Sequence, residues 1–307
     1  MIDILMATYN GEKYLQQQLD SILHQSNQDW RLIIRDDCST DNTVELIKEY
    51  QLLRPEQIQL IQAGQTGGSA QNNFFQLLQY STANYVMFAD QDDVWLRQKV
   101  ETTLDKMGQM EQQYGKDIPL LVHTDLAVVD ENLRVLNHSL FDMHNMDYRR
   151  NELNNILVQN IVTGCTVMVN RSLLNMITET PEYAVMHDMW FALIAAAFGK
   201  IGFIDKATML YRQHGRNVKG ARNMKTISYT LKKMRQLNEI HAGLVNQYRQ
   251  AEEFLKLYDV SLSKEQKVIL KDYASLKNSD VFRKTRVLTR HDLYKKGFIR
   301  KAGQILL

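Results

Sequence analysis

The sequence predicts an α/β protein with a mostly parallel sheet, followed by a C-terminal helical extension. Over the first 210 residues, short apolar runs alternate with segments whose apolar residues recur at helical spacing. This succession is typical of parallel sheets built from strand–helix–strand units. From about residue 221 the pattern is helical throughout, with Lys and Arg among Leu, Met, Tyr and Phe. We therefore expect an α/β catalytic domain over residues 1–220 and a basic α-helical region over 221–307.

Each predicted strand is a short apolar run, and most of these runs end in polar residues. The predicted strands are 2–7, 30–35, 58–62, 85–89, 120–129, 162–170 (behind a break at Gly164) and 201–211. Helical patterns lie between them, with Asn10 as a candidate N-cap of the first helix. Asn42 and Glu45 form a candidate capping box for the second helix, which ends before Pro55. Further helical patterns run through 74–78, after residue 93 and over 189–198.

Polar residues follow three of the predicted strands. They are the segments Thr8-Tyr9-Asn10, Asp36-Asp37 and Asp90-Gln91-Asp92-Asp93. In open α/β sheets, ligands bind beyond the carboxyl ends of the strands. We therefore expect these three segments to converge on one ligand site.

Three carboxylates lie within four residues at the end of the fourth predicted strand: Asp90, Asp92 and Asp93. Packing gives little reason for this arrangement, because like charges repel. Mg²⁺ or Mn²⁺ takes carboxylate oxygens from the protein and fills its other positions with phosphates and water. The stretch therefore predicts a metal–diphosphate site, and a solvated acidic turn that caps the next helix is the alternative.

The other two polar strand ends offer groups that suit a nucleotide. Thr8, Tyr9 and Asn10 supply a hydroxyl, an aromatic face and an amide, although turn chemistry explains this triplet equally well. Asp37, with Asp36, supplies acceptors for a base N–H or for ribose hydroxyls. Acidic residues favoured by the positive end of a helix dipole are the alternative here.

Two segments of the second half carry groups suited to catalysis. Asp188 opens an apolar helix and is a candidate general base, whereas a simple N-cap beside a hydrogen-bonded His187 is the alternative. Arg212, His214 and Arg216 form a candidate diphosphate clamp, because guanidinium groups match phosphate oxygens. A solvated basic loop is the alternative for this second segment.

Taken together, these segments resemble the family-2 glycosyltransferases, whose nucleotide-sugar-binding fold is called GT-A. The resemblance covers about residues 1–215, and its matching segments are 6–11, 35–41, 90–93 and 187–188. The segments 88–95, 187–190 and 211–217 look more like the bacterial rhamnosyltransferase-like branch. That branch builds cell-wall, capsular or O-antigen polysaccharide.

The resemblance implies an inverting, metal-dependent transfer of rhamnose or another hexose. The implied donor is dTDP-rhamnose or a UDP-hexose, and the implied acceptor is a glycan or a lipid-linked sugar. Asp90 and Asp92 match the ends of the family's Asp-x-Asp motif, with Asp92 as the favoured direct ligand of Mg²⁺ or Mn²⁺. Asp188 matches the catalytic base. The residues expected to bind the nucleotide-sugar are Ala7, Thr8, Tyr9, Asn10, Asp37, Gly67, Asn73, Asp90, Gln91, Arg212 and His214.

One position departs from the family pattern in the turn after the second strand. Cys38 replaces a glycine that is common there. Glycine is used where a turn needs a positive φ. The cysteine therefore predicts that this turn does not require one.

Charge is divided unevenly along the chain. Residues 211–307 contain 22 Lys and Arg against 8 Asp and Glu, a net charge of +14, and the remainder carries −12. A basic tail of this kind suits docking on the anionic inner leaflet of a membrane, where each Lys or Arg contributes about 1 kcal/mol. The segments 232–235 and 298–301 are the expected contact points. An oligomerisation or core-covering helical domain is the alternative.

The cysteine content, the N-terminal segment and the lengths of the apolar runs indicate where in the cell the protein acts. Two cysteines, Cys38 and Cys165, argue against a disulfide scaffold. The N-terminal segment lacks a basic region, and no apolar run reaches the roughly 20 residues of a spanning helix. We therefore expect a cytoplasmic protein, peripheral at the inner face of the plasma membrane.

Two other functions compete with transfer of a sugar. A sugar-nucleotide nucleotidyltransferase uses a similar sheet and metal but normally has a Gly-rich, basic loop after the first strand, where this chain has Thr8-Tyr9-Asn10-Gly11. A non-catalytic polyanion-binding protein would use the basic tail. The tail shows no nucleic-acid-binding module, so we expect no nucleic-acid partner.

Overall fold

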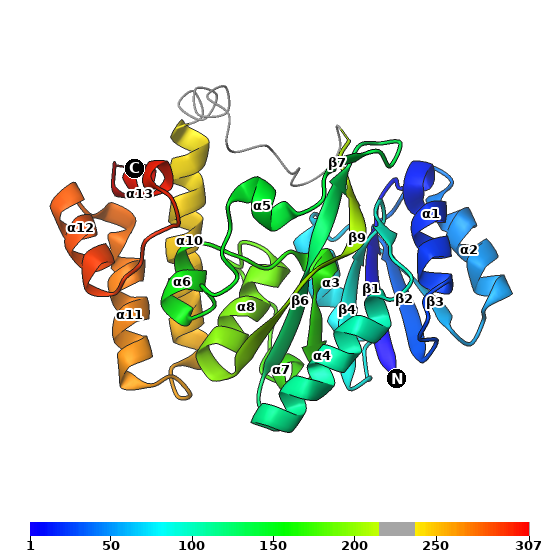
Figure 1. The fold of residues 1–307 in the computed structure, drawn as a ribbon, viewed down its shortest axis with the longest axis horizontal. Helices are drawn as coiled ribbons and strands as arrows, with labels where there is room; N and C mark the ends of the chain where they lie inside the picture. Colours follow the sequence, from blue (N-terminus) through cyan, green and yellow to red (C-terminus); the bar gives the residue numbers. More distant parts are fainter. Residues whose placement is uncertain (215–236, 307) are drawn as a thin grey trace. The chain divides into compact units, whose positions relative to one another are not determined.

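The computed structural model describes residues 1–214 and 237–306 (Figure 1). The chain forms two compact units, and it passes from one to the other several times. The first unit contains Met1–Leu140, Val162–Thr180 and Lys200–Ala221, and the second contains Phe141–Ile161, Pro181–Gly199 and Arg222–Leu307. The predicted boundary between residues 220 and 221 lies outside the described residues and stays a prediction.

A single mixed sheet forms the centre of the first unit, with the strand order β3-β2-β1-β4-β8-β6-β9-β5 and β7 paired to β6. β1 is parallel to β2 and β4, β2 is parallel to β3, and β6 is parallel to β9. β8 runs antiparallel to β4 and β6, as β5 does to β9. The strands are β1 (Ile2–Thr8), β2 (Trp30–Asp36), β3 (Ile58–Gln62), β4 (Tyr85–Asp90), β5 (Val94–Trp95), β6 (Leu120–Val129), β7 (Val135–Asn137), β8 (Met168–Asn170) and β9 (Lys200–Arg212). The predicted α/β fold with a mostly parallel sheet is confirmed.

The three polar strand ends lie side by side at one edge of this sheet. Ala7 in β1 is paired with Arg35 in β2 on one side and with Asp90 in β4 on the other. Thr8 is paired with Asp36 at the next position. The register of the sheet therefore brings together the groups that the sequence predicted to converge.

The helices of the first unit cover the sheet with apolar faces. The strand order reverses after β3, so right-handed crossovers place α1 and α2 on one face and α3 on the other. β1 and β2 are almost continuously apolar because such strands are buried on both faces. The helices are α1 (Glu12–Leu23), α2 (Thr43–Leu53), α3 (Ala70–Leu78), α4 (Lys99–Tyr114) and α7 (Arg171–Leu174).

Three local predictions are wrong. The N-cap of α1 is Gly11, because Asn10 turns its side-chain oxygen to the backbone N–H of Thr40 (2.8 Å). Asn42 is the N-cap of α2 but forms no capping box, because its side chain donates to Glu12. The predicted strand 162–170 is too long: the expected break at Gly164 is a 3₁₀ turn, η1 (Gly164–Thr166), and only β8 follows it.

The second unit is helical in its described residues. Its centre is an aromatic cluster in which Trp190 and Phe198 of α8 contact Phe254 and Tyr258 of α10. α11 begins with a capping box between Ser263 and Gln266. The elements are α5 (Leu140–His144, which starts at the last residue of the first unit), α6 (Leu153–Val158), α8 (His187–Phe198), α10 (Leu237–Tyr258), α11 (Lys264–Ala274), η2 (Ser275–Asn278), α12 (Val281–Arg290) and α13 (Phe298–Leu306). This confirms the predicted C-terminal helices.

Among the described residues, no helix combines the length and the apolar character needed to cross a membrane. The longest, α10, has 22 residues but carries charged and polar groups along its length.

Candidate active site

Thr8 and Asp36 fasten the ends of β1 and β2 to each other. The buried Thr8 Oγ1 donates to Asp36 Oδ1 (2.9 Å), and Ser39 donates to the same carboxylate through its hydroxyl (2.6 Å) and its backbone N–H (2.8 Å). The bond from Thr8 to Asp36 fixes the strand ends that frame the site. The predicted contact between Thr8 and a nucleotide stays a prediction.

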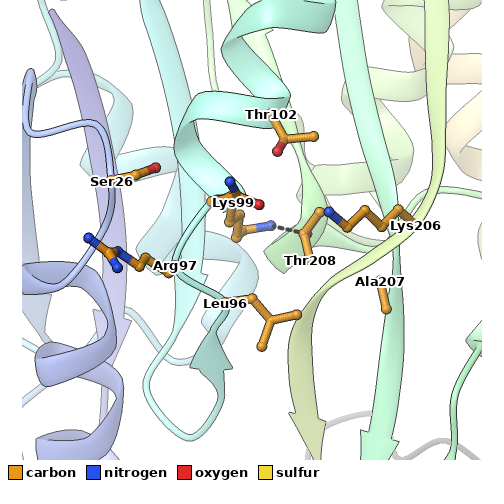
Figure 2. Close-up of a pocket in the computed structure, with 9 residues that line it drawn as sticks. Ser26, Leu96, Arg97, Lys99, Thr102, Lys206, Ala207 and Thr208 are labelled. Carbon is orange, nitrogen blue, oxygen red and sulfur yellow. Dashed lines mark hydrogen bonds between the residues drawn. The ribbon is translucent and has the colours of Figure 1, made fainter.

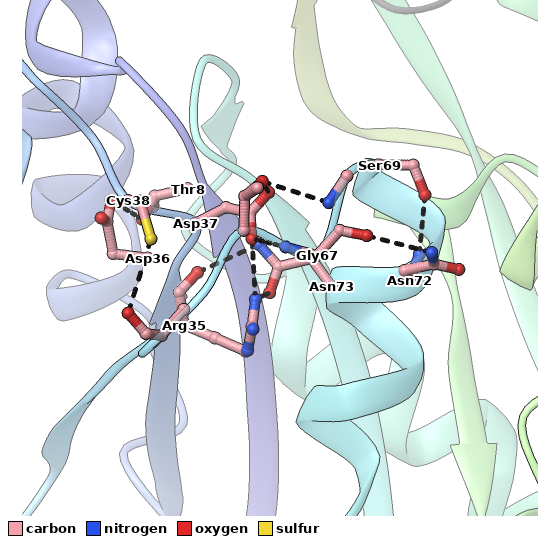
Figure 3. A network of polar contacts seen from close by, with 12 residues as sticks. Thr8, Arg35, Asp36, Asp37, Cys38, Gly67, Ser69, Asn72 and Asn73 are labelled. Atoms are coloured by element: carbon pink, nitrogen blue, oxygen red, sulfur yellow. Dashed lines mark hydrogen bonds and ion pairs between the residues drawn. The ribbon is translucent and has the colours of Figure 1, made fainter.

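The Asp37 carboxylate is held by groups from β2 and from the loop that contains Thr66 and Gly67 (Figure 3). Arg35 Nη1 (3.1 Å) and the Gly67 N–H donate to its Oδ1, and the Thr66 hydroxyl donates to its Oδ2 (2.9 Å). Burial works to raise the pKa of Asp37, but the hydrogen bonds from Gly67, Thr66 and Arg35 lower it below its usual value. Asp37 is therefore a charged, fixed acceptor at the end of β2.

Asn73 connects this carboxylate to the start of α3. Its Oδ1 accepts from Arg35 Nη1 (2.9 Å), and its Nδ2 donates to the Arg35 carbonyl (3.3 Å). Ser69 caps the same helix by accepting from the Asn72 N–H (3.1 Å). The loop that contains Gly67 is thereby attached to β2 on one side and to α3 on the other (Figure 3).

The turn after Asp37 contains a residue in the left-handed region. Cys38 has a φ of 67°, which a β-carbon disfavours by roughly 1–2 kcal/mol. The prediction that this turn does not need a positive φ is therefore wrong. The left-handed step turns the chain so that Ser39 reaches back to Asp36, and the cysteine occupies it in spite of its side chain.

Tyr9 and Gln91 join the end of β1 to the acidic segment. The Tyr9 N–H donates to Gln91 Oε1 (2.9 Å), and Gln91 Nε2 donates to the Tyr9 carbonyl (3.0 Å). A β-carbon on Gly11 would lie 2.3 Å from Gln91 Oε1, so only glycine leaves room for this amide. The Tyr9 side chain is 57% exposed.

Asp92 is paired with a histidine from the end of the first unit. Its Oδ2 lies 2.6 Å from His214 Nε2, and both side chains are largely buried. The His214 ring in turn lies 4.9 Å from the ring of Tyr14. The structure thus brings together Asp92 and His214, which the sequence places 122 residues apart.

Asp93 points away from this pair into the protein. It is fully buried, and its Oδ1 accepts from the Arg212 N–H (3.0 Å). Burial, and then the charges of Asp92 and Asp90, raise the pKa of Asp93 well above its usual range. Cys165 lies beside it, and burial raises the pKa of that thiol as well.

Potential metal ligands gather at this point. Among the described residues, one oxygen or sulfur atom from each of Asp90, Asp93 and Cys165 lies within 4.8 Å of the others. Asp93 and Cys165 are buried and Cys165 offers sulfur, whereas a hard cation prefers oxygen donors and keeps room for phosphates and water. The oxygens that do suit Mg²⁺ or Mn²⁺ are those of the partly exposed Asp90 and Asp92.

Arg212 does not lie where the sequence predicted it. Its guanidinium is 1% exposed, donates to the carbonyls of Asp92 (2.8 Å) and Glu131 (2.6 Å) and to Gln17 Oε1 (2.5 Å), and lies over the ring of Tyr14. The predicted diphosphate clamp is therefore corrected at this residue. Arg212 fixes the backbone of the acidic segment against β9, and Arg216 lies outside the described residues.

Asp188 belongs to the second unit, in the first turn of α8. Its Oδ1 accepts from Asn160 Nδ2 (3.1 Å) and from the Met189 N–H (2.6 Å). The N-cap position is held by Met186, so Asp188 does not serve as the cap. Its predicted role as a general base stays a prediction.

Sequence reasoning missed several residues that build the site. Arg35 left one signal, because a strand that is otherwise apolar tolerates an arginine only when it is paired. Tyr14, Gln17 and Glu131 left none, since each acts through a partner far away in the chain.

A hollow that contains none of the predicted site residues lies beside the start of α4 (Figure 2). It has a volume of about 460 Å³ and borders β5, the start of α4 and residues 206–208 of β9. Lys99 is buried beside it, with Nζ 3.3 Å from Thr208 Oγ1 and 4.9 Å from the centre of the Trp95 ring. Burial lowers the pKa of Lys99 to about 8. The residues that line the hollow are Ser26, Leu96, Arg97, Gln98, Lys99, Thr102, Lys206, Ala207 and Thr208, and none of the predicted site residues is among them.

Comparison with known proteins identifies a family and relatives of this chain. The family model described as "Glycosyl transferase family 2" matches residues 3–174. The dTDP-rhamnosyl transferase RfbG of Shigella flexneri is 29% identical over 231 residues, which cover 70% of this chain and 74% of that protein.

Solved structures share the fold. TarS from S. aureus superimposes with a TM-score of 0.59 at 15% identity over 90% of this chain, which spans only 43% of that protein. Residues 1–349 of TarS in complex with UDP give a TM-score of 0.56 at 18% identity, with 96% and 93% of the two chains covered. The mannosyltransferase PcManGT from Pyrobaculum calidifontis, in complex with GDP-Man and Mn²⁺, gives 0.55 at 15% identity, with 98% and 77% covered.

Proposed function

This chain belongs to glycosyl transferase family 2, and from that premise we propose that it transfers a sugar from a nucleoside-diphosphate donor to a hydroxyl group of a glycan or lipid-linked acceptor. The process served is the synthesis of bacterial cell-surface polysaccharide. One observation carries the proposal. The ends of β1, β2 and β4 place a fixed carboxylate, an exposed aromatic face and two partly exposed acidic side chains along one edge of the sheet.

The nucleoside lies along the ends of β1 and β2 in this proposal. The charged Asp37 accepts from the base or the ribose, and the exposed Tyr9 ring packs against the base. Gly67 and Asn73 hold the loop that closes this side. The relative RfbG is named a dTDP-rhamnosyl transferase, which supports dTDP-rhamnose as the first donor to test, beside UDP-hexoses.

Asp90 and Asp92 are proposed to hold Mg²⁺ or Mn²⁺. The fit rests on their two partly exposed carboxylates, which supply the oxygen ligands that hard cations take. When bound, such a cation neutralises negative charge that develops on a departing nucleoside diphosphate. The pairing with His214 fixes the orientation of Asp92, and the backbone contacts of Arg212 keep the acidic segment in place.

Asp188 is proposed as the general base. It would accept the proton of the acceptor hydroxyl while that oxygen attacks the anomeric carbon of the donor, and the configuration at this carbon would be inverted. The hydrogen bonds from Asn160 and the Met189 N–H hold the carboxylate in one orientation.

Calorimetry with and without metal tests the proposal. The wild-type chain is titrated with dTDP-rhamnose and with UDP-hexoses, once with Mn²⁺ and once with EDTA. We expect the best donor to bind at least tenfold more weakly in EDTA. Asp92→Ala should show the weak affinity in both conditions, whereas Asp105→Ala, which changes an exposed acid on α4, should behave as the wild type. Equal donor affinity with Mn²⁺ and with EDTA would remove the metal from the proposal.

Asp188→Asn separates binding from chemistry. A general base contributes about 10²–10⁴-fold to a rate, so this variant should lose at least 99% of transfer and keep its donor affinity. A variant that keeps more than about a tenth of the wild-type rate would show that Asp188 is not the base.

A further inference from the structure

Helix α13 exposes its apolar residues and buries a polar one. Phe298, Ile299 and Leu306 are 86%, 65% and 70% exposed, whereas Gln304 is 2% exposed. Helices on the surface of a globular protein normally turn the apolar face inward. Folding of the second unit therefore gives no reason for the exposed face of α13.

The burial of Gln304 is specific, which shows that the orientation of α13 is built into the fold. Its Nε2 donates to the Leu293 carbonyl (2.7 Å), and its Oε1 accepts from the Lys295 N–H (3.1 Å). Arg300 donates to the His144 carbonyl (2.9 Å) on the same side of the helix. The polar side of α13 is therefore anchored inward, and the apolar side is held outward.

Helix α12 adds to the same exposed apolar character. Phe282, in its first turn, is 88% exposed, and the neighbouring Val281 is also exposed. The buried side of α12 contains Leu288 and the stem of Lys284. α12 and α13 contact each other, so the exposed aromatic residues belong to one part of the second unit.

Positive charge surrounds these residues. Residues 281–306 contain eight Lys and Arg against one acidic residue, Asp292. Among the eight, Arg283, Arg286, Arg290 and Lys301 are exposed. An apolar face flanked by Lys and Arg is the pattern of a helix that lies in the interface of an anionic membrane.

Charge also decides between a membrane and a second copy of this chain. Two copies facing each other through α12 and α13 would bring two strongly basic segments together, and their mutual repulsion opposes that contact. A bilayer that contains anionic lipids supplies both the negative charge and the apolar boundary. The bilayer is therefore the occupant that satisfies both features.

We propose that α12 and α13 form a docking surface for an anionic lipid bilayer. Phe282, Phe298 and Ile299 enter the boundary between headgroups and acyl chains, and the exposed Lys and Arg contact lipid phosphates. The purpose of this docking rests on the proposed function, because a lipid-linked acceptor lies at such a surface. The binding itself is independent of it.

Flotation of the full chain with vesicles tests the proposal. Vesicles of phosphatidylcholine alone are compared with vesicles that also contain phosphatidylglycerol, each at low and at high salt. We expect binding to the anionic vesicles, and a decrease of at least tenfold at high salt. The double variant Phe298→Ser, Ile299→Ser should bind at least tenfold more weakly, with an unchanged thermal midpoint because both side chains are exposed. Leu52→Ser, which changes an exposed leucine of α2 in the first unit, is the matched control and should bind as the wild type.

A second double variant tests the contribution of the positive charges to vesicle binding. Arg286→Glu combined with Lys301→Glu should reduce binding to anionic vesicles and leave the apolar residues in place. Equal binding of the wild type to neutral and anionic vesicles, or unchanged binding by both variants, would overturn the docking surface. Dimerisation that the Phe298→Ser, Ile299→Ser variant abolishes, without vesicle binding by the wild type, would assign this face to a second copy instead.

Donor calorimetry on the same variants separates this inference from the proposed function. The docking variants should bind the donor as the wild type does. Vesicle binding without any donor binding would leave the surface standing and remove the proposed function. Donor binding without vesicle binding would remove the docking surface and leave the proposed function standing.

Discussion

At the scale of single residues, Cys38 carries a measurable strain. Its positive φ costs a residue with a β-carbon roughly 1–2 kcal/mol, and glycine avoids this cost but loses about 0.5–1 kcal/mol of conformational entropy. We therefore expect Cys38→Gly to raise the free energy of unfolding by up to about 1 kcal/mol. Urea denaturation followed by circular dichroism measures the change.

Cys38→Val is the matched control for this prediction. A β-branched side chain is a poor occupant of the left-handed region, so this variant should lower the free energy of unfolding. If Gly and Val at this position shifted stability in the same direction, the strain assigned to Cys38 would not exist.

The same scale shows what the sequence could and could not predict at the site. The position of Asp90 and Asp92 at the candidate site was predictable, because carboxylates at the end of a buried strand have few structural reasons to be there. The burial of Arg212 was not, because its partners Gln17 and Glu131 are separated from it by many residues. A basic residue near a phosphate site looks the same in a sequence whether it faces the ligand or holds the backbone.

At the scale of elements, Asp3 pins the start of β1 to the turn before β4. Its Oδ2 accepts from the Ser81 hydroxyl (2.8 Å) and from the N–H groups of Thr82 (3.0 Å) and Ala83 (3.1 Å), and Arg31 pairs with its Oδ1 (3.0 Å). Burial works to raise the pKa of Asp3, but the bonds from Arg31, Ala83 and Ser81 outweigh it and lower the pKa below 3.8.

Asp3→Asn should therefore lower the free energy of unfolding by about 2 kcal/mol at neutral pH, because hydrogen bonds to a charged group are lost. The folded state binds this proton less readily than the unfolded state. The stabilisation is thus fully present above about pH 4, and it is lost as the pH falls through the folded pKa.

The pH dependence of urea unfolding checks this prediction. The difference between wild type and Asp3→Asn should shrink as the pH falls from 4 toward 2. Asp29→Asn, which changes an exposed acid paired only with the N-terminus, should stay within about 0.5 kcal/mol of the wild type. A difference between Asp3→Asn and the wild type that is constant across this range would assign the loss to packing and not to charge.

Elements that form only by pairing with residues far away in the sequence could not be predicted. β5 has two residues and forms a strand only because Val94 and Trp95 pair with Leu210 and Met209 of β9. The break at η1 is different, because Gly164 marks it in the sequence. The long strand β6 was predictable to the residue, because all ten of its residues are buried and burial determines its composition.

At the scale of the whole molecule, the two units bear on the predicted domain boundary. The aromatic cluster of the second unit joins Trp190 and Phe198, which precede residue 220, to Phe254 and Tyr258, which follow it. A chain cut after residue 220 would leave the partners of this cluster missing. We therefore expect the 1–220 fragment to bind the dye ANS and to unfold without a cooperative transition.

The full-length chain is the reference for this experiment. It should exclude ANS and unfold cooperatively under the same conditions. A 1–220 fragment that is monomeric, excludes ANS and unfolds with a sharp transition would show that residues 1–220 do form a domain of their own.

The alternation of the chain between its two units also determines how it can be recombined with its relatives. A chimera joined at a single point would combine helices that have never been selected to fit each other. An exchange of the second unit would have to include everything after residue 221 together with the segments Phe141–Ile161 and Pro181–Gly199. Three segments exchanged together through five junctions are therefore the natural unit of exchange when such enzymes are rebuilt for a new acceptor.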